Sequence, residues 1–256
     1  DLILVGPESV VREAATQGGL DGVEIVDAPD VLADTDTPTE ALRKKPRNSI
    51  AVGVGLVQQK KAGAFVSAGS TGTCVAAATM GLGCLEGIRR PAIGAIIAGE
   101  KNPFLVLDVG ANPQPKPLHL AQYALMGAAY YRGTFGVDQP KVGMLNIGSE
   151  ELKGTPLVKE ARQILKQMPI AFHGNVEGND IFKGTTDIVV CDGFVGNVAL
   201  KTTEGLAYMI SGLIKEEFSC NWISRLMALA AMPVLLRFKK RVDHRNYNGA
   251  VLLGLR

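Results

Sequence analysis

The sequence predicts an α/β fold: a three-layer α/β/α sandwich around a mostly parallel sheet, with a protruding helical segment. Three observations lead to this prediction. Short β-branched runs alternate with helical stretches along the chain. Several strand candidates are apolar on both faces, as parallel strands covered by helices must be. With 256 residues, 46% of them hydrophobic, the chain is long enough to bury a sizeable core.

Eight segments are expected to form strands: residues 2–6, 23–27, 64–67, 92–97, 104–109, 142–147, 170–174 and 187–192. Six are expected to form helices: residues 7–17, 48–61, 71–82, 117–135, 156–167 and 196–218. The pair Thr155-Pro156 marks a helix start, because threonine is a favourable N-cap and proline suits the first helical position. No polar linker divides the chain, so we expect one α/β domain over residues 1–256, with a helical appendage at residues 219–245.

The overall charge and the cysteine pattern exclude several classes of protein. The 27 Lys+Arg against 25 Asp+Glu give a net charge of +2, which argues against a nucleic-acid binder. Four well-separated cysteines without a C-x-x-C pair argue against a zinc site and for a reducing compartment. The first residues lack the pattern of a signal peptide, and the longest charge-free apolar run outside the predicted strands covers only residues 226–236. We therefore expect a cytoplasmic protein with no metal site.

Glycine-rich clusters follow five of the predicted strands. Ligands of open α/β sheets bind at the carboxyl ends of the strands, and glycine lets backbone N–H groups approach an anion there. One such cluster would more often be an ordinary turn, but five, all carrying Asn, Asp, Ser or Thr, predict a shared polar site. The candidate phosphate-binding residues are Ser67, Gly69, Ser70, Thr71, Gly72, Asp108, Gly110, Asn112, Asn146, Gly148, Asn175, Asp192, Gly193 and Gly196.

The familiar catalytic and cofactor motifs are missing from the sequence. It has no P-loop, no dinucleotide fingerprint and no nucleophile elbow, so no cofactor is expected and a nicotinamide dehydrogenase is disfavoured. Cys191 could be a thiol nucleophile, but its apolar run favours a buried residue. His173 could be a general base, but a structural role is favoured. A site rich in anion-binding loops and poor in nucleophiles suggests that the substrate, such as inorganic phosphate, is itself the nucleophile.

Two residues are the candidate catalytic groups for such a reaction. Lys153 precedes the helix start at Thr155 and could supply the fixed cation that binds phosphate, or it could be a solvated lysine at a helix end. Asn197 follows Gly196 and could donate a hydrogen bond to a developing oxyanion, or it could cap the helix.

The ordered series of motifs resembles one family, the phosphate acyltransferases of bacterial phospholipid synthesis. The matching segments are residues 40–45, 65–72, 107–112, 145–154, 174–180, 191–197, 201–205, 248–250 and 252–254. The resemblance implies transfer of a long-chain acyl group from acyl-carrier protein to inorganic phosphate by direct attack, without an acyl-enzyme. It also implies a homodimer, a fold related to phosphotransacetylases and isocitrate dehydrogenase-like enzymes, and a catalytic centre at Lys153 and Asn197.

The appendage combines an apolar helical face with basic residues. Trp222, Leu226, Leu229 and Ala230 have helical spacing, and Pro233 is expected to break or kink the helix. Such a segment is typical of an interfacial membrane anchor, and a hairpin buried in a dimer contact is the alternative. The resemblance, whose members bind membranes peripherally, favours the anchor.

Three questions of partner and function stay open. The basic residues Arg43, Lys44, Lys45 and Arg47 could form an acyl-carrier-protein dock or an ordinary solvated surface. The acyl donor could instead be a short-chain acyl-CoA. The third alternative is that the protein is not an enzyme but a scaffold at a membrane. The complete series of motifs argues against this alternative.

Overall fold

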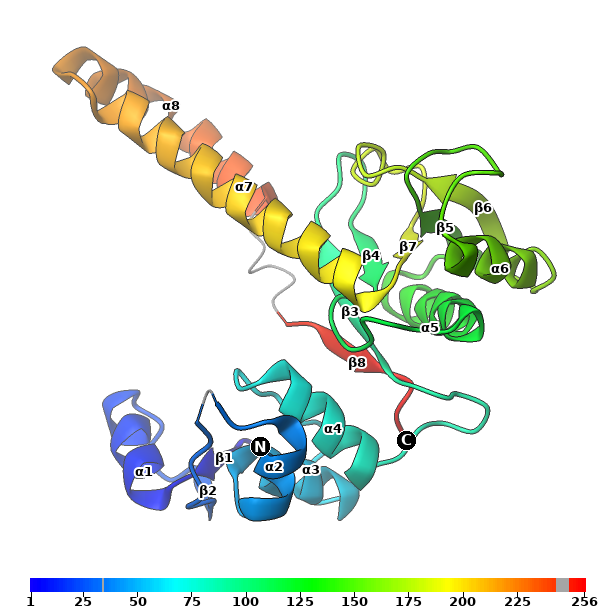
Figure 1. Cartoon of the computed structure of the whole chain (residues 1–256). Coiled ribbons are helices and arrows are strands. Elements are labelled where there is room, and N and C mark those ends of the chain that lie inside the picture. Colours follow the sequence, from blue (N-terminus) through cyan, green and yellow to red (C-terminus); the bar gives the residue numbers. More distant parts are fainter. Residues whose placement is uncertain (34, 243–248) are drawn as a thin grey trace. The chain divides into compact units, whose positions relative to one another are not determined.

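The computed structural model describes residues 1–33, 35–242 and 249–256, which form two compact units (Figure 1). Unit 1 comprises Asp1–Pro91 and Gly254–Arg256, and unit 2 comprises Ala92–Leu253. The sequence predicted one domain with a helical appendage, and the structure divides the chain into these two compact units. The boundary was not visible in the sequence because it falls between a turn and a strand, at Pro91 and Ala92, with no polar linker.

Unit 1 contains a two-stranded parallel sheet and four helices. Its elements are β1 (Ile3–Gly6), α1 (Glu8–Gln17), β2 (Glu24–Asp27), α2 (Pro38–Lys44), α3 (Ser49–Gln58) and α4 (Thr71–Gly81). The helix α2 was not predicted, although Thr37 caps it and Pro38 begins it. The strand predicted at residues 64–67 is wrong: this segment is irregular, and Val66 is 92% exposed. Phe65 in this segment packs against a helix instead of a sheet, because its ring fills the space over Gly53 of α3.

Unit 2 is built on a six-stranded sheet with the order β6-β5-β7-β4-β3-β8. Its strands are β3 (Ala92–Ile97), β4 (Phe104–Leu107), β5 (Lys141–Leu145), β6 (Ala171–Val176), β7 (Ile188–Val190) and β8 (Val251–Leu253). The four neighbours β6, β5, β7 and β4 are parallel, whereas β3 and β8 run antiparallel to their neighbours. The prediction of an α/β fold with a mostly parallel sheet is confirmed, although β8 was not predicted.

The core of unit 2 lies around its two central strands. Every residue of β4 and β7 is buried, which explains why these runs are apolar on both faces. The helix α5 (Pro117–Phe135) packs on β4, β5 and β7 and places Tyr123 and Tyr131 in this core, and α6 (Pro156–Leu165) packs on α5. These contacts fix the strand ends that carry the predicted site.

The helices α7 (Gly193–Ser219) and α8 (Trp222–Val242) form a hairpin that leads away from the sheet (Figure 1). The first part of α7 contacts β4, and α8 packs along α7. Pro233 was expected to break or kink the helix; it does not break it, because α8 continues through this residue. Proline removes one helical hydrogen bond, and packing against α7 supports the remaining turns. The appendage predicted at residues 219–245 is described as far as Val242.

Candidate active site

The predicted site residues of unit 2 gather at one edge of its sheet. Because β6, β5, β7 and β4 are parallel neighbours, their carboxyl ends lie along the same edge. Four segments meet there: residues 108–112 after β4, residues 146–155 after β5, residues 175–177 at the end of β6, and residues 191–197 after β7. Ser67, Gly69, Ser70, Thr71 and Gly72 belong to unit 1.

Asp108 organises the loop after β4. Its side chain is fully buried, and its Oδ1 accepts hydrogen bonds from the backbone N–H groups of Ile93, Gly110 and Ala111 at 3.0, 3.2 and 3.0 Å. Its Oδ2 accepts from the backbone and side-chain amides of Asn112 at 2.7 and 3.0 Å. Five donors thus surround this carboxylate, so Asp108 and Asn112 shape the loop from inside.

Gly193 and Gly196 allow the first turn of α7 to pack against that loop. A Cβ atom at Gly193 would lie 2.8 Å from the backbone nitrogen of Asn112, and one at Gly196 would collide with the carbonyl oxygen of Asp108. The Gly193 N–H donates to the Asn112 carbonyl at 2.9 Å, and the Gly196 N–H to the Asp192 carbonyl at 2.9 Å. Close packing therefore accounts for these two glycines, and their contact with a ligand stays a prediction.

Asn197 extends from α7 with an exposed side chain. A Cβ atom built on Gly110 would be 3.8 Å from Asn197 Oδ1, so the amide lies beside the loop after β4. The reading of Asn197 as the helix cap is wrong, because Asp192 caps α7 by accepting the Val195 N–H at 2.8 Å. Within the described part of the chain, no hydrogen bond occupies the Asn197 amide, which leaves it available to a ligand.

Two asparagines hold the loop after β5. The Asn146 amide donates to the carbonyl oxygens of Gly148 and Lys153 at 3.2 and 3.1 Å, and the Asn175 amide donates to that of Glu150 at 3.0 Å. Gly154 has a φ of +101°, and a Cβ atom there would lie 2.5 Å from Asn146 Oδ1. Asn146 and Asn175 were predicted to contact substrate, and the structure gives their amides this supporting role.

Lys153 presents a half-exposed ammonium group at this edge. Its Nζ lies 2.8 Å from Glu150 Oε1, and 49% of the lysine side chain is accessible. This hydrogen bond, together with the charge of Glu150, raises the pKa of Lys153 above its ordinary value and lowers the pKa of Glu150. Lys153 is therefore a permanent cation near neutral pH, suited to binding an anion and unsuited to accepting a proton.

Gly148 makes room for this ion pair. A Cβ atom there would lie 2.7 Å from Glu150 Oε2 and 3.0 Å from Lys153 Nζ. Glu150 was not among the predicted site residues, although an acid three residues before the candidate cation Lys153 is visible in the sequence.

Two hydroxyls of unit 1 have local roles. Ser67 Oγ accepts the Gly69 N–H at 3.1 Å, and Ser70 Oγ caps α4 by accepting the Thr73 N–H at 3.4 Å. Thr71 and Gly72 form the exposed first turn of α4.

Cys191 is a core residue, as its apolar surroundings predicted. It is 3% exposed, its Sγ lies 3.5 Å from the carbonyl oxygen of Asp108, and burial raises the pKa of the thiol well above the ordinary value. It is therefore a protonated, inaccessible thiol and a poor nucleophile. His173 is exposed on β6. Across the described ranges, no group of three or more His, Cys, Asp and Glu residues is arranged to hold a metal ion.

Comparisons with known proteins give the family. The whole chain, residues 1–256, matches the family model described as "Fatty acid synthesis protein". It is 49% identical over 259 residues to the phosphate acyltransferase of Paraburkholderia phytofirmans, and 48% identical over 258 residues to that of Paraburkholderia xenovorans. Each alignment covers all of this chain and 70% of the relative. The chain belongs to the phosphate acyltransferase family. The resemblance stated from its motifs is confirmed.

The fold of this phosphate acyltransferase family member resembles those of two solved phosphotransacetylase structures. The EutD phosphotransacetylase from Staphylococcus aureus matches with a TM-score of 0.58 and 20% identity, covering 80% of this chain and 74% of that one. A phosphotransacetylase from Streptococcus pyogenes matches with a TM-score of 0.58 and 24% identity, covering 80% and 73%. The predicted relation to the phosphotransacetylase fold is confirmed.

Proposed function

We propose that this chain, as a phosphate acyltransferase, moves a long-chain fatty acyl group from acyl-carrier protein to inorganic phosphate, giving acyl phosphate for phospholipid synthesis. One observation carries the proposal. Lys153, which is paired with the exposed Glu150, and Asn197 extend exposed polar groups from the carboxyl ends of neighbouring strands. In contrast, Asp108, Asn146 and Asn175 are held in hydrogen bonds to the backbone. The exposed cation and amide are the two groups that phosphate and a thioester would need.

The reaction follows from these two groups. Lys153 binds the phosphate and turns one of its oxygens toward the thioester carbonyl carbon. As the new C–O bond forms, the Asn197 amide donates a hydrogen bond to the carbonyl oxygen, where negative charge develops. The C–S bond then breaks, and the carrier thiolate leaves and takes a proton from water. No acyl-enzyme is needed, in keeping with the burial of Cys191.

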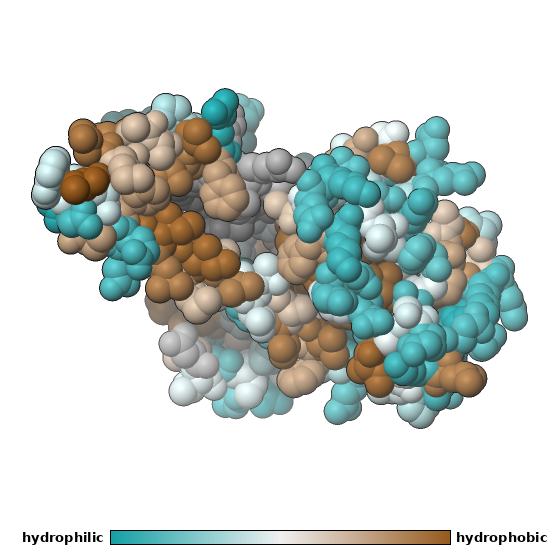
Figure 2. Space-filling model, turned by 90° about the horizontal axis from the view of Figure 1, so that it is seen from above, coloured by the Kyte–Doolittle hydropathy of each residue, from teal (hydrophilic) through white to brown (hydrophobic). Residues whose placement is uncertain are grey.

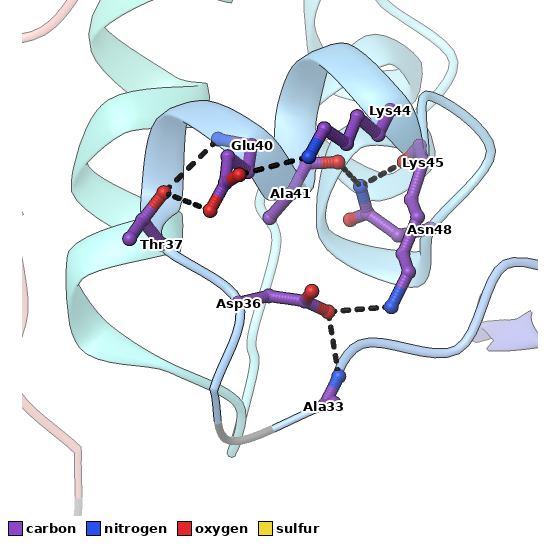
Figure 3. Close-up of polar contacts among 8 residues, drawn as sticks. All are labelled: Ala33, Asp36, Thr37, Glu40, Ala41, Lys44, Lys45 and Asn48. Carbon is purple, nitrogen blue, oxygen red and sulfur yellow. Dashed lines mark hydrogen bonds and ion pairs between the residues drawn. The ribbon is translucent and has the colours of Figure 1, made fainter.

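The basic residues proposed to dock the carrier protein are largely paired with acids. Lys44 Nζ lies 2.8 Å from Glu40 Oε1, and Lys45 Nζ lies 2.5 Å from Asp36 Oδ2. Both pairs are drawn in Figure 3. Arg47 also lies 3.1 Å from Asp27. These pairs reduce the positive potential of the run, so Arg43, which is exposed, is the strongest candidate within it for steering an acidic carrier.

The exposed apolar residues of the α7–α8 hairpin support the proposal of a peripheral membrane contact. Trp222, Leu226, Leu229 and Ala230 are all exposed, and the first three show 75, 61 and 67% of their surface. Figure 2 shows apolar side chains gathered over the hairpin, at the left of the view. No helix among the described residues is long and apolar enough to cross a membrane. We assign these four residues to contact with a lipid surface, and homodimer formation through the hairpin is the second candidate role.

The proposed donor is tested by comparing thioesters. The chain is incubated with phosphate and either hexadecanoyl–acyl-carrier protein or a short-chain acyl-CoA, and acyl phosphate is trapped with hydroxylamine. A higher kcat/KM for the long-chain carrier substrate supports the proposal. Preference for the short-chain acyl-CoA would favour the alternative donor, and no product from either would favour a scaffold.

A further inference from the structure

An apolar hollow of about 470 Å³ opens at the carboxyl edge of the sheet in unit 2. Its walls are formed by Pro113, Gln114 and Pro115 after β4, Leu157 in the first turn of α6, and Asp192, Phe194 and Val195 at the start of α7. Gln114 and Asp192 are polar, and the other five residues are apolar. The volume falls within the usual range for small-molecule sites. None of the five apolar residues was among the predicted site residues.

The hollow lies beside the candidate catalytic groups. The helix α6 begins three residues after Lys153, and α7 carries Asn197 one turn beyond Phe194. Phe194 is 66% exposed and Val195 is 41% exposed, although both stand next to the tightly packed glycines of the same turn. Exposed apolar side chains grouped in a concave surface commonly mark a binding site.

We propose that this hollow binds the methylenes of the fatty acyl chain beyond the first few carbons from the thioester, and that its walls set the preference for acyl-chain length. This inference rests on the proposed acyl transfer to phosphate. The occupant follows from position, because an acyl chain whose carbonyl carbon is held between Lys153 and Asn197 begins at this edge. Each methylene that leaves water in such a hollow contributes favourable transfer free energy.

A second hollow in unit 2 provides the comparison. It has a volume of about 530 Å³ and is lined by Leu125, Arg132 and Asp138, among others, at the amino ends of β5 and β6. Since Lys153 and Asn197 lie at the carboxyl ends, an acyl chain in this second hollow would be at the wrong end of the strands. Leu125, 43% exposed, is therefore a matched control residue.

The test fills the proposed site and measures chain-length preference in the full chain. In Leu157→Trp and Val195→Trp, kcat/KM for hexadecanoyl–acyl-carrier protein should fall about tenfold or more. The kcat/KM for butanoyl–acyl-carrier protein, whose chain ends before these walls, should stay near that of the unchanged protein. Leu157→Phe should give a smaller loss in the same direction, and Leu125→Trp should change neither value. The milder variant keeps the test valid if a tryptophan variant fails to fold.

Two results would overturn the inference. Equal changes for both chain lengths, or none, would show that the walls do not contact the acyl chain. Loss of self-association in size-exclusion chromatography, with unchanged preference, would show that a second copy occupies the hollow. If the unchanged protein formed no acyl phosphate from any donor, the proposed function itself would fail, which distinguishes that outcome from these two.

Discussion

The Lys153 ammonium lies 2.8 Å from the Glu150 carboxylate, three residues earlier in the same loop. Gly148 leaves the space that both side chains occupy. In the absence of substrate, Glu150 is thus the counter-ion of the group proposed to bind phosphate. An incoming phosphate would compete with this carboxylate for the same cation.

Replacing Glu150 should therefore change the pH dependence. Glu150 raises the pKa of Lys153, so Glu150→Gln should lower that pKa toward its ordinary value of 10.5. Lysine loses its charge as the pH rises through its pKa, so the alkaline loss of kcat/KM for phosphate should begin at a lower pH in the variant. The matched control is Glu151→Gln, because Glu151 pairs with Lys166 and Arg162 instead. If the pH profile of kcat/KM for phosphate had the same alkaline limb in Glu150→Gln as in the unchanged protein, the contact between Glu150 and Lys153 would be contradicted.

Lys153 and Asn197 should have separable kinetic effects. Lys153→Ala should raise KM for phosphate about tenfold or more, because it removes a charged hydrogen-bond donor. Asn197→Ala should lower kcat by about 10²–10³, since the amide acts mainly in the transition state. Lys159→Ala, an exposed lysine on α6, is the control. Steady-state kinetics with phosphate and the acyl donor varied in turn would measure both effects, and kinetics like those of the control would remove either residue from the mechanism.

Gly196 should be intolerant of even a methyl group. In Gly196→Ala the new Cβ would collide with the Asp108 carbonyl oxygen, so we expect the free energy of unfolding to fall by about 1–3 kcal/mol. Gly205→Ala on the same helix meets nothing within 4 Å and should raise the free energy of unfolding by about 0.5–1 kcal/mol. Denaturant unfolding of both variants provides the measurement. Equal stabilities would mean that α7 does not pack against the loop after β4 as described.

The exposed face of α8 should determine binding to lipid. Leu226→Glu and Leu229→Glu should abolish sedimentation with anionic liposomes, because each introduces a charge into the apolar surface, while activity on soluble substrate is retained. Val10→Glu is the control, since Val10 is a 62% exposed residue on α1. Unchanged liposome binding combined with an altered oligomeric state would assign this face to a dimer contact.

The sequence predicted well those elements whose ends carry local signals. The helix Pro117–Phe135 was predicted with its observed bounds, since proline begins it and Gly136 ends it in a left-handed conformation with a φ of 69°. The strand expected at residues 64–67 failed because an apolar run does not reveal whether it faces a sheet or a helix. The short β8 failed for a related reason, because three apolar residues form a strand only through their neighbour β3.

The sequence predicted where the polar clusters lie on the sheet better than what each residue contacts there. The clusters did mark the carboxyl ends of β4, β5, β6 and β7, which the parallel order brings together. However, Gly193 and Gly196 read equally as ligand-contacting or closely packed residues, because both roles require the absence of a Cβ atom. Only the three-dimensional contact with Asn112 and Asp108 shows that close packing requires both glycines. The apolar hollow at Phe194 could not be predicted from the sequence either, because its walls come from three separate segments.

The central claim is that phosphate itself attacks the acyl thioester at Lys153 and Asn197. The most direct test is to incubate the protein with hexadecanoyl–acyl-carrier protein, with and without inorganic phosphate, and to trap the product with hydroxylamine. We predict acyl hydroxamate that depends on phosphate and is strongly reduced in Lys153→Ala and Asn197→Ala. Acyl hydroxamate formed equally without phosphate, or none formed by the unchanged protein, would contradict the claim.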